Sequence, residues 1–274
     1  MILIAASSKD VAGLNIARQI LTHYPFNKTN DVFQETPVYS AEINEKQVHL
    51  ITLQEEAINA QTLPDHFTGL NLIVFVSRHS SASGTPTLSV HTPGNFAAAE
   101  LGGLPRQVST SPAAAMQTAL KALKRYQEEM NLEYAVSYEC THHGPSLKVP
   151  TMFVELGSSA KQWSDTKAAE AVAHAAIHAI ANFTVPNRTA VLGIGGTHYN
   201  QRFTQMSLAD EAVFSHMIPK YAVQHVTATL LIHCMERTLE KVNNAILDWK
   251  GIKSADKPKL LAALQEIRLP YTRV

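Results

Sequence analysis

The sequence predicts an α/β protein in which a mixed central sheet is enclosed by helices, giving three layers. Short apolar runs typical of buried strands alternate along the chain with longer amphipathic runs typical of helices. This alternation favours a sheet with helices on both faces. Two strand-like runs flank residues 44–47 and predict a hairpin, so some strands should be antiparallel.

The first half of the chain contains most of the predicted strands. The run over 72–76 is continuously apolar, as expected for a strand covered on both faces. Ser111-Pro112 predicts a helix start, since proline fits the first helical position. The elements expected here, in order, are a strand over 1–6, a helix over 10–24, strands over 38–43, 48–53, 72–76 and 87–91, a helix from 111 to about 129, and a strand over 134–138.

The second half is predicted to be mainly helical. Ser164 is the expected cap of an alanine-rich helix that reaches about residue 181. The other expected elements are strands over 152–155 and 189–194 and helices over 208–216, 228–249 and 257–267. No repeat, low-complexity tract or linker divides the sequence, so we expect a single domain over 1–274.

Composition narrows the class of protein. The 274 residues are 45% hydrophobic, which is enough for a packed core. Lysine plus arginine (23) balances aspartate plus glutamate (23), so a nucleic-acid partner would need a local basic patch. The two cysteines favour a reducing compartment. The N-terminus does not resemble a signal peptide, and no apolar stretch approaches roughly 20 residues. We expect a soluble, cytoplasmic monomer without a membrane partner.

Four polar segments follow strand-like runs and carry the candidate chemistry. They cover residues 77–81, 139–145, 155–159 and 193–199. Ligands of open α/β sheets bind outside the carboxyl ends of the strands, so these segments should meet. Imidazole binds zinc or transfers protons near neutral pH, and carboxylates orient it or act as bases. The glycine pair Gly195-Gly196 would let backbone N–H groups approach a phosphate or an oxyanion.

Each of these candidates also has an ordinary structural interpretation. His142 and His143 point in opposite directions if their segment is extended, so one of them could be structural. Glu155 could be a buried carboxylate paired with Arg78, whose charge would lower its pKa while burial would raise it. Cys140 beside His142 suggests a thiol mechanism, but a buried, unreactive cysteine is the more common case.

Two further motifs favour structural interpretations. Glu170, His174 and His178 recur every four residues and share one helix face, but the alanines around them favour hydrogen-bonded helix histidines over a metal site. The run 193–196 matches neither the dinucleotide fingerprint nor the P-loop, so we expect no nucleotide cofactor.

Several of these segments resemble the D-aminoacyl-tRNA deacylase family of archaea and plants. The resemblance includes Ser77-Arg78-His79-Ser80, residues 87–95, Thr141-His142-His143-Gly144-Pro145, residues 153–158, residues 193–199, Ile218-Pro219-Lys220-Tyr221 and residues 247–251. It covers most of the chain in order, so it is more specific than any single motif. It implies hydrolysis of the ester that joins a D-amino acid to tRNA, a requirement for Zn²⁺, and a fold similar to the phosphorylase and peptidyl-tRNA hydrolase group.

The resemblance and the residue types together give an expected site, in which a metal-bound or base-activated water attacks the ester. The expected catalytic residues are His142, His143, Glu155 and His198. The expected zinc ligands are His79, His91, His142 and Glu155. The expected substrate-binding residues are Arg78, Asn95, Gly195, Gly196, Tyr199 and Lys220, with the glycines as oxyanion donors and the two cations as phosphate ligands.

Two other functions are compatible with the same residues. A zinc-dependent peptidase or amidohydrolase would use the same histidines on an amide bond. A tRNA-binding or metal-storage protein would bind without turnover, and its histidines and carboxylates would not need to converge.

Overall fold

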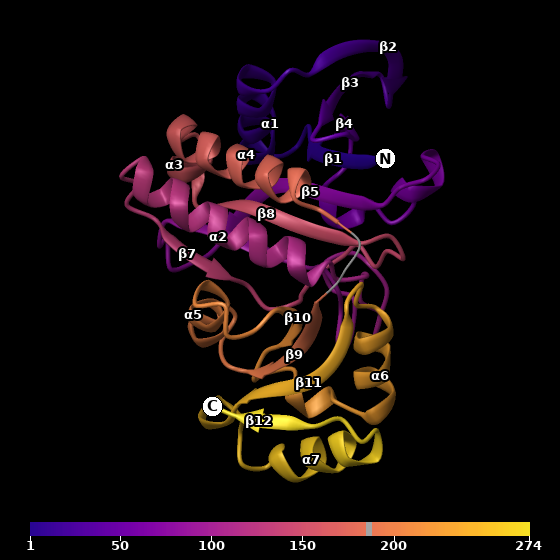
Figure 1. Cartoon of the computed structure of the whole chain (residues 1–274), viewed down its shortest axis with the longest axis vertical. Helices are drawn as coiled ribbons and strands as arrows, with labels where there is room; N and C mark the ends of the chain where they lie inside the picture. Colours follow the sequence, from indigo (N-terminus) through magenta and orange to yellow (C-terminus); the bar gives the residue numbers. More distant parts are fainter. Residues whose placement is uncertain (185–187) are drawn as a thin grey trace.

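Residues 1–184 and 188–274, which the computed structural model describes, form two β-sheets with helices between and around them (Figure 1). The strands of the first sheet are β1 (Ile2–Ser7), β2 (Asn27–Phe33), β3 (Thr36–Ile43), β4 (Lys46–Leu53), β5 (Leu72–Ser80), β6 (Thr87–His91), β7 (Ala135–Tyr138) and β8 (Thr151–Ser158). Their order is β2-β3-β4-β1-β5-β8-β6-β7.

This eight-stranded sheet has mixed strand directions. β1 runs parallel to its neighbours β4 and β5, and β5 runs parallel to β8. β3 is antiparallel to both β2 and β4, and β6 is antiparallel to β8. The expected α/β class with a mixed sheet, including the hairpin around residues 44–47, is therefore confirmed.

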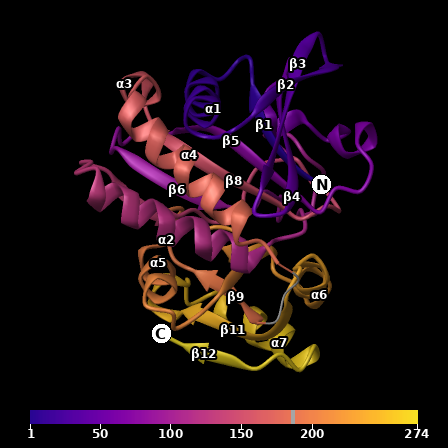
Figure 2. The same cartoon turned by 45° about the horizontal axis from the view of Figure 1, so that its top comes forward.

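Three long helices cover one face of this sheet and lie side by side (Figures 1 and 2). They are α1 (Val11–His23), α4 (Thr166–Ala181) and α2 (Ala113–Glu129), and the short α3 (Ala160–Trp163) precedes α4. The alanines of α4 are almost all buried, because small side chains allow the helix backbone to approach its neighbours closely. The cap of α4 is Asp165 and not the predicted Ser164: its carboxylate accepts hydrogen bonds from the backbone N–H groups of Lys167 and Ala168.

The opposite face of the eight-stranded sheet is covered by loops and by two short 3₁₀ helices. These are η1 (Ala57–Asn59) and η2 (Leu63–His66). Their apolar residues pack with the stacked rings of Phe75 and Phe153, whose centroids are 4.7 Å apart. Loops leave room for cavities that packed helices would fill, so this face is where a binding site is expected.

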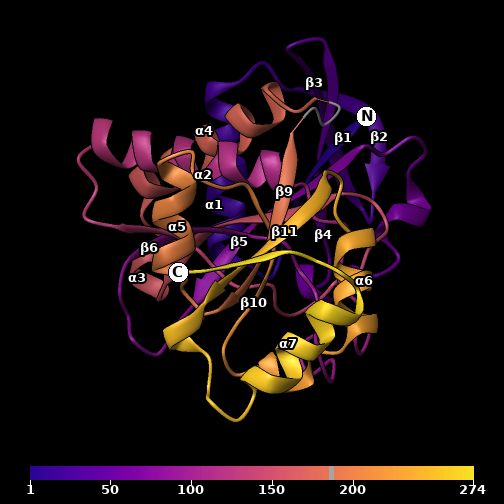
Figure 3. The same cartoon turned by 60° about the horizontal axis from the view of Figure 1, so that its bottom comes forward.

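A second, all-parallel sheet was not predicted. Its strands are β9 (Thr189–Gly195), β10 (Phe214–Ile218), β11 (Lys241–Asp248) and β12 (Tyr271–Arg273), in the order β10-β9-β11-β12. The helices of this part are α5 (Gln201–Leu208), α6 (Ala228–Glu236) and α7 (Lys257–Glu266). Apolar residues of α6 and α7 form a core with this sheet, and Figure 3 shows both helices beside β11.

Two predicted helices are wrong because they include strands of this second sheet. The range 208–216 contains the end of α5 and the beginning of β10, and the range 228–249 contains α6 followed by β11. The edge strand β2 was also missed, because its mostly exposed residues carry little apolar alternation. Among the described residues, none of the helices has both the length and the apolar character needed to span a membrane.

Candidate active site

Polar side chains occupy the loop-covered face of three adjacent strands. Parallel pairing places Ser77 of β5 beside Glu155 of β8, and antiparallel pairing places Ser89 of β6 on the other side of Glu155. His79 and His91 lie two residues further along β5 and β6, so they share this face. His79 therefore lies within a strand, and not in a loop after it as predicted, because β5 continues to residue 80. Glu155, the last residue of the predicted strand over 152–155, lies in the middle of β8, which continues to residue 158.

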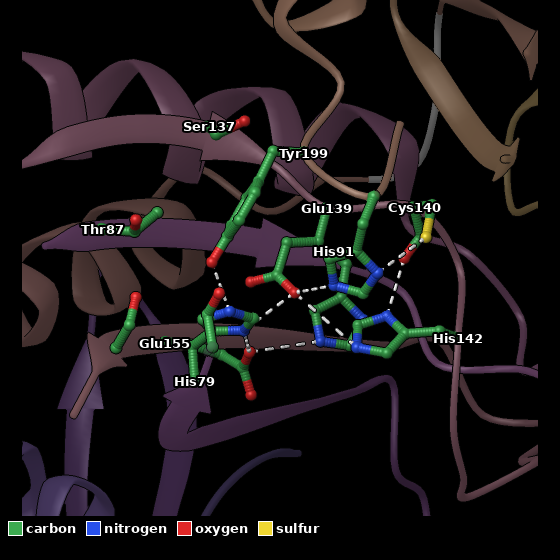
Figure 4. A network of polar contacts seen from close by, with 12 residues as sticks. His79, Thr87, His91, Ser137, Glu139, Cys140, His142, Glu155 and Tyr199 are labelled. Carbon is green, nitrogen blue, oxygen red and sulfur yellow. Dashed lines mark hydrogen bonds and ion pairs between the residues drawn. The ribbon is translucent and has the colours of Figure 1, made fainter. Parts of the chain in front are cut away.

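Glu139 lies at the centre of the site, directly after β7, and its side chain is fully buried. Its Oε2 accepts hydrogen bonds from His198 Nε2 at 2.8 Å and His79 Nδ1 at 3.0 Å, and it lies 3.6 Å from His142 Nε2 (Figure 4). Its Oε1 has no hydrogen-bond partner among the described residues. Glu139 was absent from the expected catalytic and metal sets, although it belongs to one of the four polar segments.

Glu155 is the second buried carboxylate. Its Oε1 accepts a hydrogen bond from Ser77 Oγ at 2.5 Å, and its Oε2 lies 3.5 Å from His91 Nε2 and 3.7 Å from His79 Nδ1. The alternative pairing of Glu155 with Arg78 is wrong. Arg78 is directed away from the cluster and donates to Glu56 Oε1 at 3.1 Å, so the structure does not bring it to the site.

Four of the predicted residues thus meet in one place. His79, His142, Glu155 and His198 are all linked through Glu139 or through one another. Tyr199, predicted to bind substrate, hydrogen-bonds His79 Nε2 through its hydroxyl and so belongs to the same network (Figure 4). His198 and Tyr199 follow β9, so the second sheet contributes to a site whose other residues come from the first.

His91, His142 and His143 form a group with a shared hydrogen-bond pattern. Their Nδ1 atoms lie 2.6–3.3 Å from the backbone carbonyl oxygens of Thr92, Cys140 and Gly144. A carbonyl only accepts, so each Nδ1 carries a proton, and in the neutral form of each ring the free lone pair is on Nε2. One ring nitrogen from each histidine lies within 4.8 Å of the other two. His91 Nε2 is buried without a hydrogen-bond partner among the described residues.

The backbone at His143 explains how neighbouring histidines reach the same place. His143 has a φ of 42°, in the left-handed region that side chains seldom adopt. This breaks the alternation of an extended segment, and the rings of His142 and His143 lie with centroids 4.3 Å apart. The expectation that the two would point in opposite directions holds only for extended backbone and is wrong here.

The cluster divides into charged and neutral imidazoles. Burial alone would lower the pKa of His79, but its contacts with Glu139 and Glu155 outweigh this effect and raise the pKa to about 11. In the same way, burial is outweighed at His198 by hydrogen bonds to Cys140 and Glu139, which raise its pKa to about 10. Burial and neighbouring histidines lower the pKa of His143 to about 4 and that of His142 well below its usual range.

This group of three histidines fits a zinc ion better than the predicted ligand set does. The histidines at 91, 142 and 143 each direct Nδ1 to a backbone carbonyl, which leaves Nε2 as the nitrogen that would bind zinc, and such hydrogen bonds are the usual support of zinc-bound histidine. The predicted set is divided between donor groups: His79 lies with Glu139 and His198, and Glu155 lies with His91 and Glu139.

One cavity adjoins the cluster, and a second lies beside the residues that follow β9. The first, which we call the histidine cavity, has a volume of about 530 Å³. It is lined by His142, His143 and His198 and by apolar residues of the loop after Asn95. Asn95 also lines it, but its amide nitrogen donates to the carbonyl of Gly102 and so holds that loop in place. The second cavity, of about 700 Å³, lies at the carboxyl ends of β9 and β11.

Two of the predicted substrate-binding residues belong to the second cavity. Gly196 and Lys220 line it, and the backbone N–H of Lys220 donates to the Gly196 carbonyl. Gly195 and Gly196 have φ values of 107° and 76°, and a Cβ at Gly196 would lie 2.4 Å from the side-chain nitrogen of Asn200. A tight turn therefore requires these glycines. Neither glycine lines the histidine cavity, where the glycines were expected to stabilise the oxyanion. Lys220, which was expected to bind phosphate, does not line that cavity either.

Comparison with known proteins identifies relatives of the whole chain. A family model described as D-aminoacyl-tRNA deacylase matches residues 66–272. Proteins named D-aminoacyl-tRNA deacylase are similar to it in Thermococcus onnurineus (33% identical, covering 100% of both chains) and in Methanocaldococcus jannaschii (33% identical, covering 99% of both).

Solved structures agree at the level of the fold. The crystal structure of a conserved protein of unknown function matches with a TM-score of 0.87 and 31% identity, over 100% of this chain and 95% of that chain. The match to a Campylobacter jejuni nucleosidase has a TM-score of only 0.44, so the likeness to the phosphorylase and peptidyl-tRNA hydrolase group stays a prediction. On the family model and the full-length relatives, the chain belongs to the D-aminoacyl-tRNA deacylase family.

Proposed function

We propose that this protein hydrolyses the ester bond of D-aminoacyl-tRNA, releasing the D-amino acid and free tRNA, in the cytoplasm where aminoacyl-tRNA serves translation. Family membership supports the substrate. The observation that carries a catalytic role is the convergence of imidazoles and buried carboxylates beside a cavity of about 530 Å³. A binding protein without turnover would not need this convergence, and the family assignment does not favour the peptidase or amidohydrolase alternative.

The histidines at 91, 142 and 143 would hold the zinc ion that the family resemblance implies. Zinc bound there would supply a water of lowered pKa and a Lewis acid for the ester carbonyl. The chain prepares these ligands by fixing the proton of each ring on Nδ1, and the lowered pKa values of His142 and His143 keep both rings neutral near pH 7.

His198 is the proton donor that the geometry favours. It lines the histidine cavity, its side chain is one-third exposed, and its hydrogen bond to Glu139 holds it in the protonated form. Ester cleavage releases the ribose oxygen as an alkoxide, which is far more basic than imidazole, so a proton held at His198 can neutralise it. Glu139 positions this imidazolium and, through His79, links it to Tyr199.

The two cavities suggest how the substrate lies. Consecutive residues line different cavities: Thr197 and Lys220 line the larger one, whereas His198 and Tyr221 line the histidine cavity. We propose that the aminoacyl group enters the histidine cavity and the terminal adenosine occupies the larger one, with the ester between them. Lys220 would then be available for phosphate, to which ammonium groups bind strongly.

The decisive experiment compares D- and L-tyrosyl-tRNA incubated with the purified protein, with and without added Zn²⁺. We expect rapid loss of the D ester, slow loss of the L ester, and a lower rate after chelation. Persistence of the D ester with zinc-replete, folded protein would contradict the proposal. Hydrolysis of a peptide amide at a comparable rate would favour the peptidase instead.

A further inference from the structure

A second cluster of metal-binding side chains lies on the helix-covered side of the molecule, apart from the site described above. His23 is the last residue of α1, and Glu170 and His174 are one turn apart on α4, the neighbouring helix. Glu170 Oε1 lies 3.5 Å from His23 Nε2 and 3.5 Å from His174 Nε2. One donor atom from each of the three residues lies within 4.8 Å of the other two.

The spacing of these donors fits a bound ion better than direct hydrogen bonding. A separation of 3.5 Å is too long for a good hydrogen bond between nitrogen and oxygen. Ligands at about 2.0–2.2 Å from a tetrahedral zinc lie roughly 3.4 Å from one another. Glu170 Oε1 therefore lies as far from each imidazole nitrogen as two ligands of a common ion would lie from each other, and the two imidazoles each offer a nitrogen within 4.8 Å of the other's.

The surroundings hold His174 in place and keep it neutral. Its Nδ1 is 2.7 Å from the Tyr24 hydroxyl, which can accept a hydrogen bond from Nδ1–H. Nε2 is then free on the side of Glu170. The ring of Tyr126, from α2, packs against His174 with centroids 4.9 Å apart. Burial, the first cause, and the nearby His23 lower the pKa of His174. An imidazole must be unprotonated to bind a metal, so both effects favour ligation.

We propose that His23, Glu170 and His174 form a second, surface site for Zn²⁺, separate from the catalytic cluster. The donor set of two imidazoles and a carboxylate is one that zinc accepts, and water would complete the coordination. All three side chains are partly exposed, so an ion can enter from solvent. The sequence favoured a structural interpretation of Glu170, His174 and His178. The proposed site uses the first two of these residues together with His23 from α1, and it does not include His178.

The expected role of this site is to link two helices, α1 and α4, that are distant in the sequence. The ion would join the end of α1 to the middle of α4, across 147 residues (170 minus 23). An ion that binds only the folded chain stabilises it in proportion to the logarithm of its concentration over the dissociation constant. Zn²⁺ should therefore raise the melting temperature beyond what the catalytic cluster alone produces.

The test uses untagged, full-length protein saturated with Zn²⁺ and then freed of loosely held metal by desalting. The variants are His23→Ala and Glu170→Gln, and the matched control is His178→Ala, one turn beyond His174 on the same helix. We expect both triad variants to hold one zinc ion fewer per chain than wild type and to lose several degrees of the zinc-induced rise in melting temperature. The control should match wild type in both.

The deacylation rate separates this proposal from the proposed function. Both triad variants should hydrolyse D-tyrosyl-tRNA at the wild-type rate, because their side chains lie outside the catalytic cluster. Equal zinc content and an equal zinc-induced shift in wild type and His23→Ala would overturn the surface site and leave an ordinary ion pair. An equal loss of zinc in His178→Ala would also overturn the assignment.

Discussion

The two faces of the eight-stranded sheet differ in what their side chains do. On the helix-covered face, β5 presents Val74 and Val76 and β8 presents Val154 and Leu156, all fully buried in one apolar core. On the loop-covered face, the alternating positions of the same strands change from aromatic residues to polar ones towards their carboxyl ends, and these polar residues include Glu155. The helix-covered face stabilises the fold. The loop-covered face buries charged groups, which lowers stability, and these groups are the reactive ones.

The largest effect should follow from a change on the polar face. His142→Ala removes an unprotonated imidazole that lines the histidine cavity, so we expect the hydrolysis of D-tyrosyl-tRNA to slow by about 10³-fold. Bound zinc should decrease together with the rate. Single-turnover kinetics and metal analysis measure the two, with His66→Ala, an exposed histidine, as the control. A normal rate in folded variant would break the proposed division between the faces.

The next effect tests the apolar face at Leu156, which follows Glu155 in β8. Leu156→Ala leaves a cavity under the helices and should lower the free energy of unfolding by about 3 kcal/mol. The turnover rate of the folded fraction should stay near that of wild type, because Leu156 points away from the cluster. Urea denaturation and kinetics at low temperature measure both quantities. A large loss of rate in fully folded protein would show that the two faces are coupled.

Glu139→Gln sharpens the role of the carboxylate that positions the histidines. Glutamine keeps the size of the side chain but removes the charge that holds His79 and His198 in their protonated forms. We expect a 10–100-fold lower rate. The decline of the rate at high pH should begin at a lower pH than in wild type, since the pKa of His198 would fall. Glu56→Gln, which only removes the partner of Arg78, should change neither property.

The smallest effect concerns stability in mild acid. In metal-free protein, His143 keeps a pKa of about 4, whereas in the unfolded chain it has an ordinary histidine pKa near 6.5. The unfolded state then binds more protons between these values, so stability falls as the pH decreases through this window. Between pH 7.5 and pH 5.5 we expect His143→Gln to lose about 1 kcal/mol less stability than wild type. Identical pH profiles for the two proteins would contradict the depressed pKa.

The sequence was sufficient for most strands of the first sheet and for several residues of the cluster. The strands over 1–6, 72–76 and 87–91 were predictable from their apolar runs, and the polar residues near their ends indicated where a site would form. The second sheet was not predictable in the same way. No glycine or proline separates α6 from β11, so a helix and a strand were predicted as one continuous helix.

Two features of the site depend on tertiary structure alone. Glu139 is central because β7 ends beside His79 and His198, which are distant from it in the sequence. His143, and not His79, groups with His91 and His142 as a possible metal ligand. Its position depends on a left-handed backbone conformation, which is uncommon for a residue other than glycine. Residue types suggested zinc chemistry, but neither strand pairing nor this conformation is encoded in spacing.

The contribution of both sheets to one cluster has a consequence for how the protein is made. His198 and Tyr199 follow β9, which lies between β10 and β11 in the second sheet, so their position depends on chain as far as residue 248. A chain emerging from the ribosome has no complete cluster until most of this sheet has been synthesised. The nascent chain is therefore expected to lack hydrolytic activity until this sheet has folded.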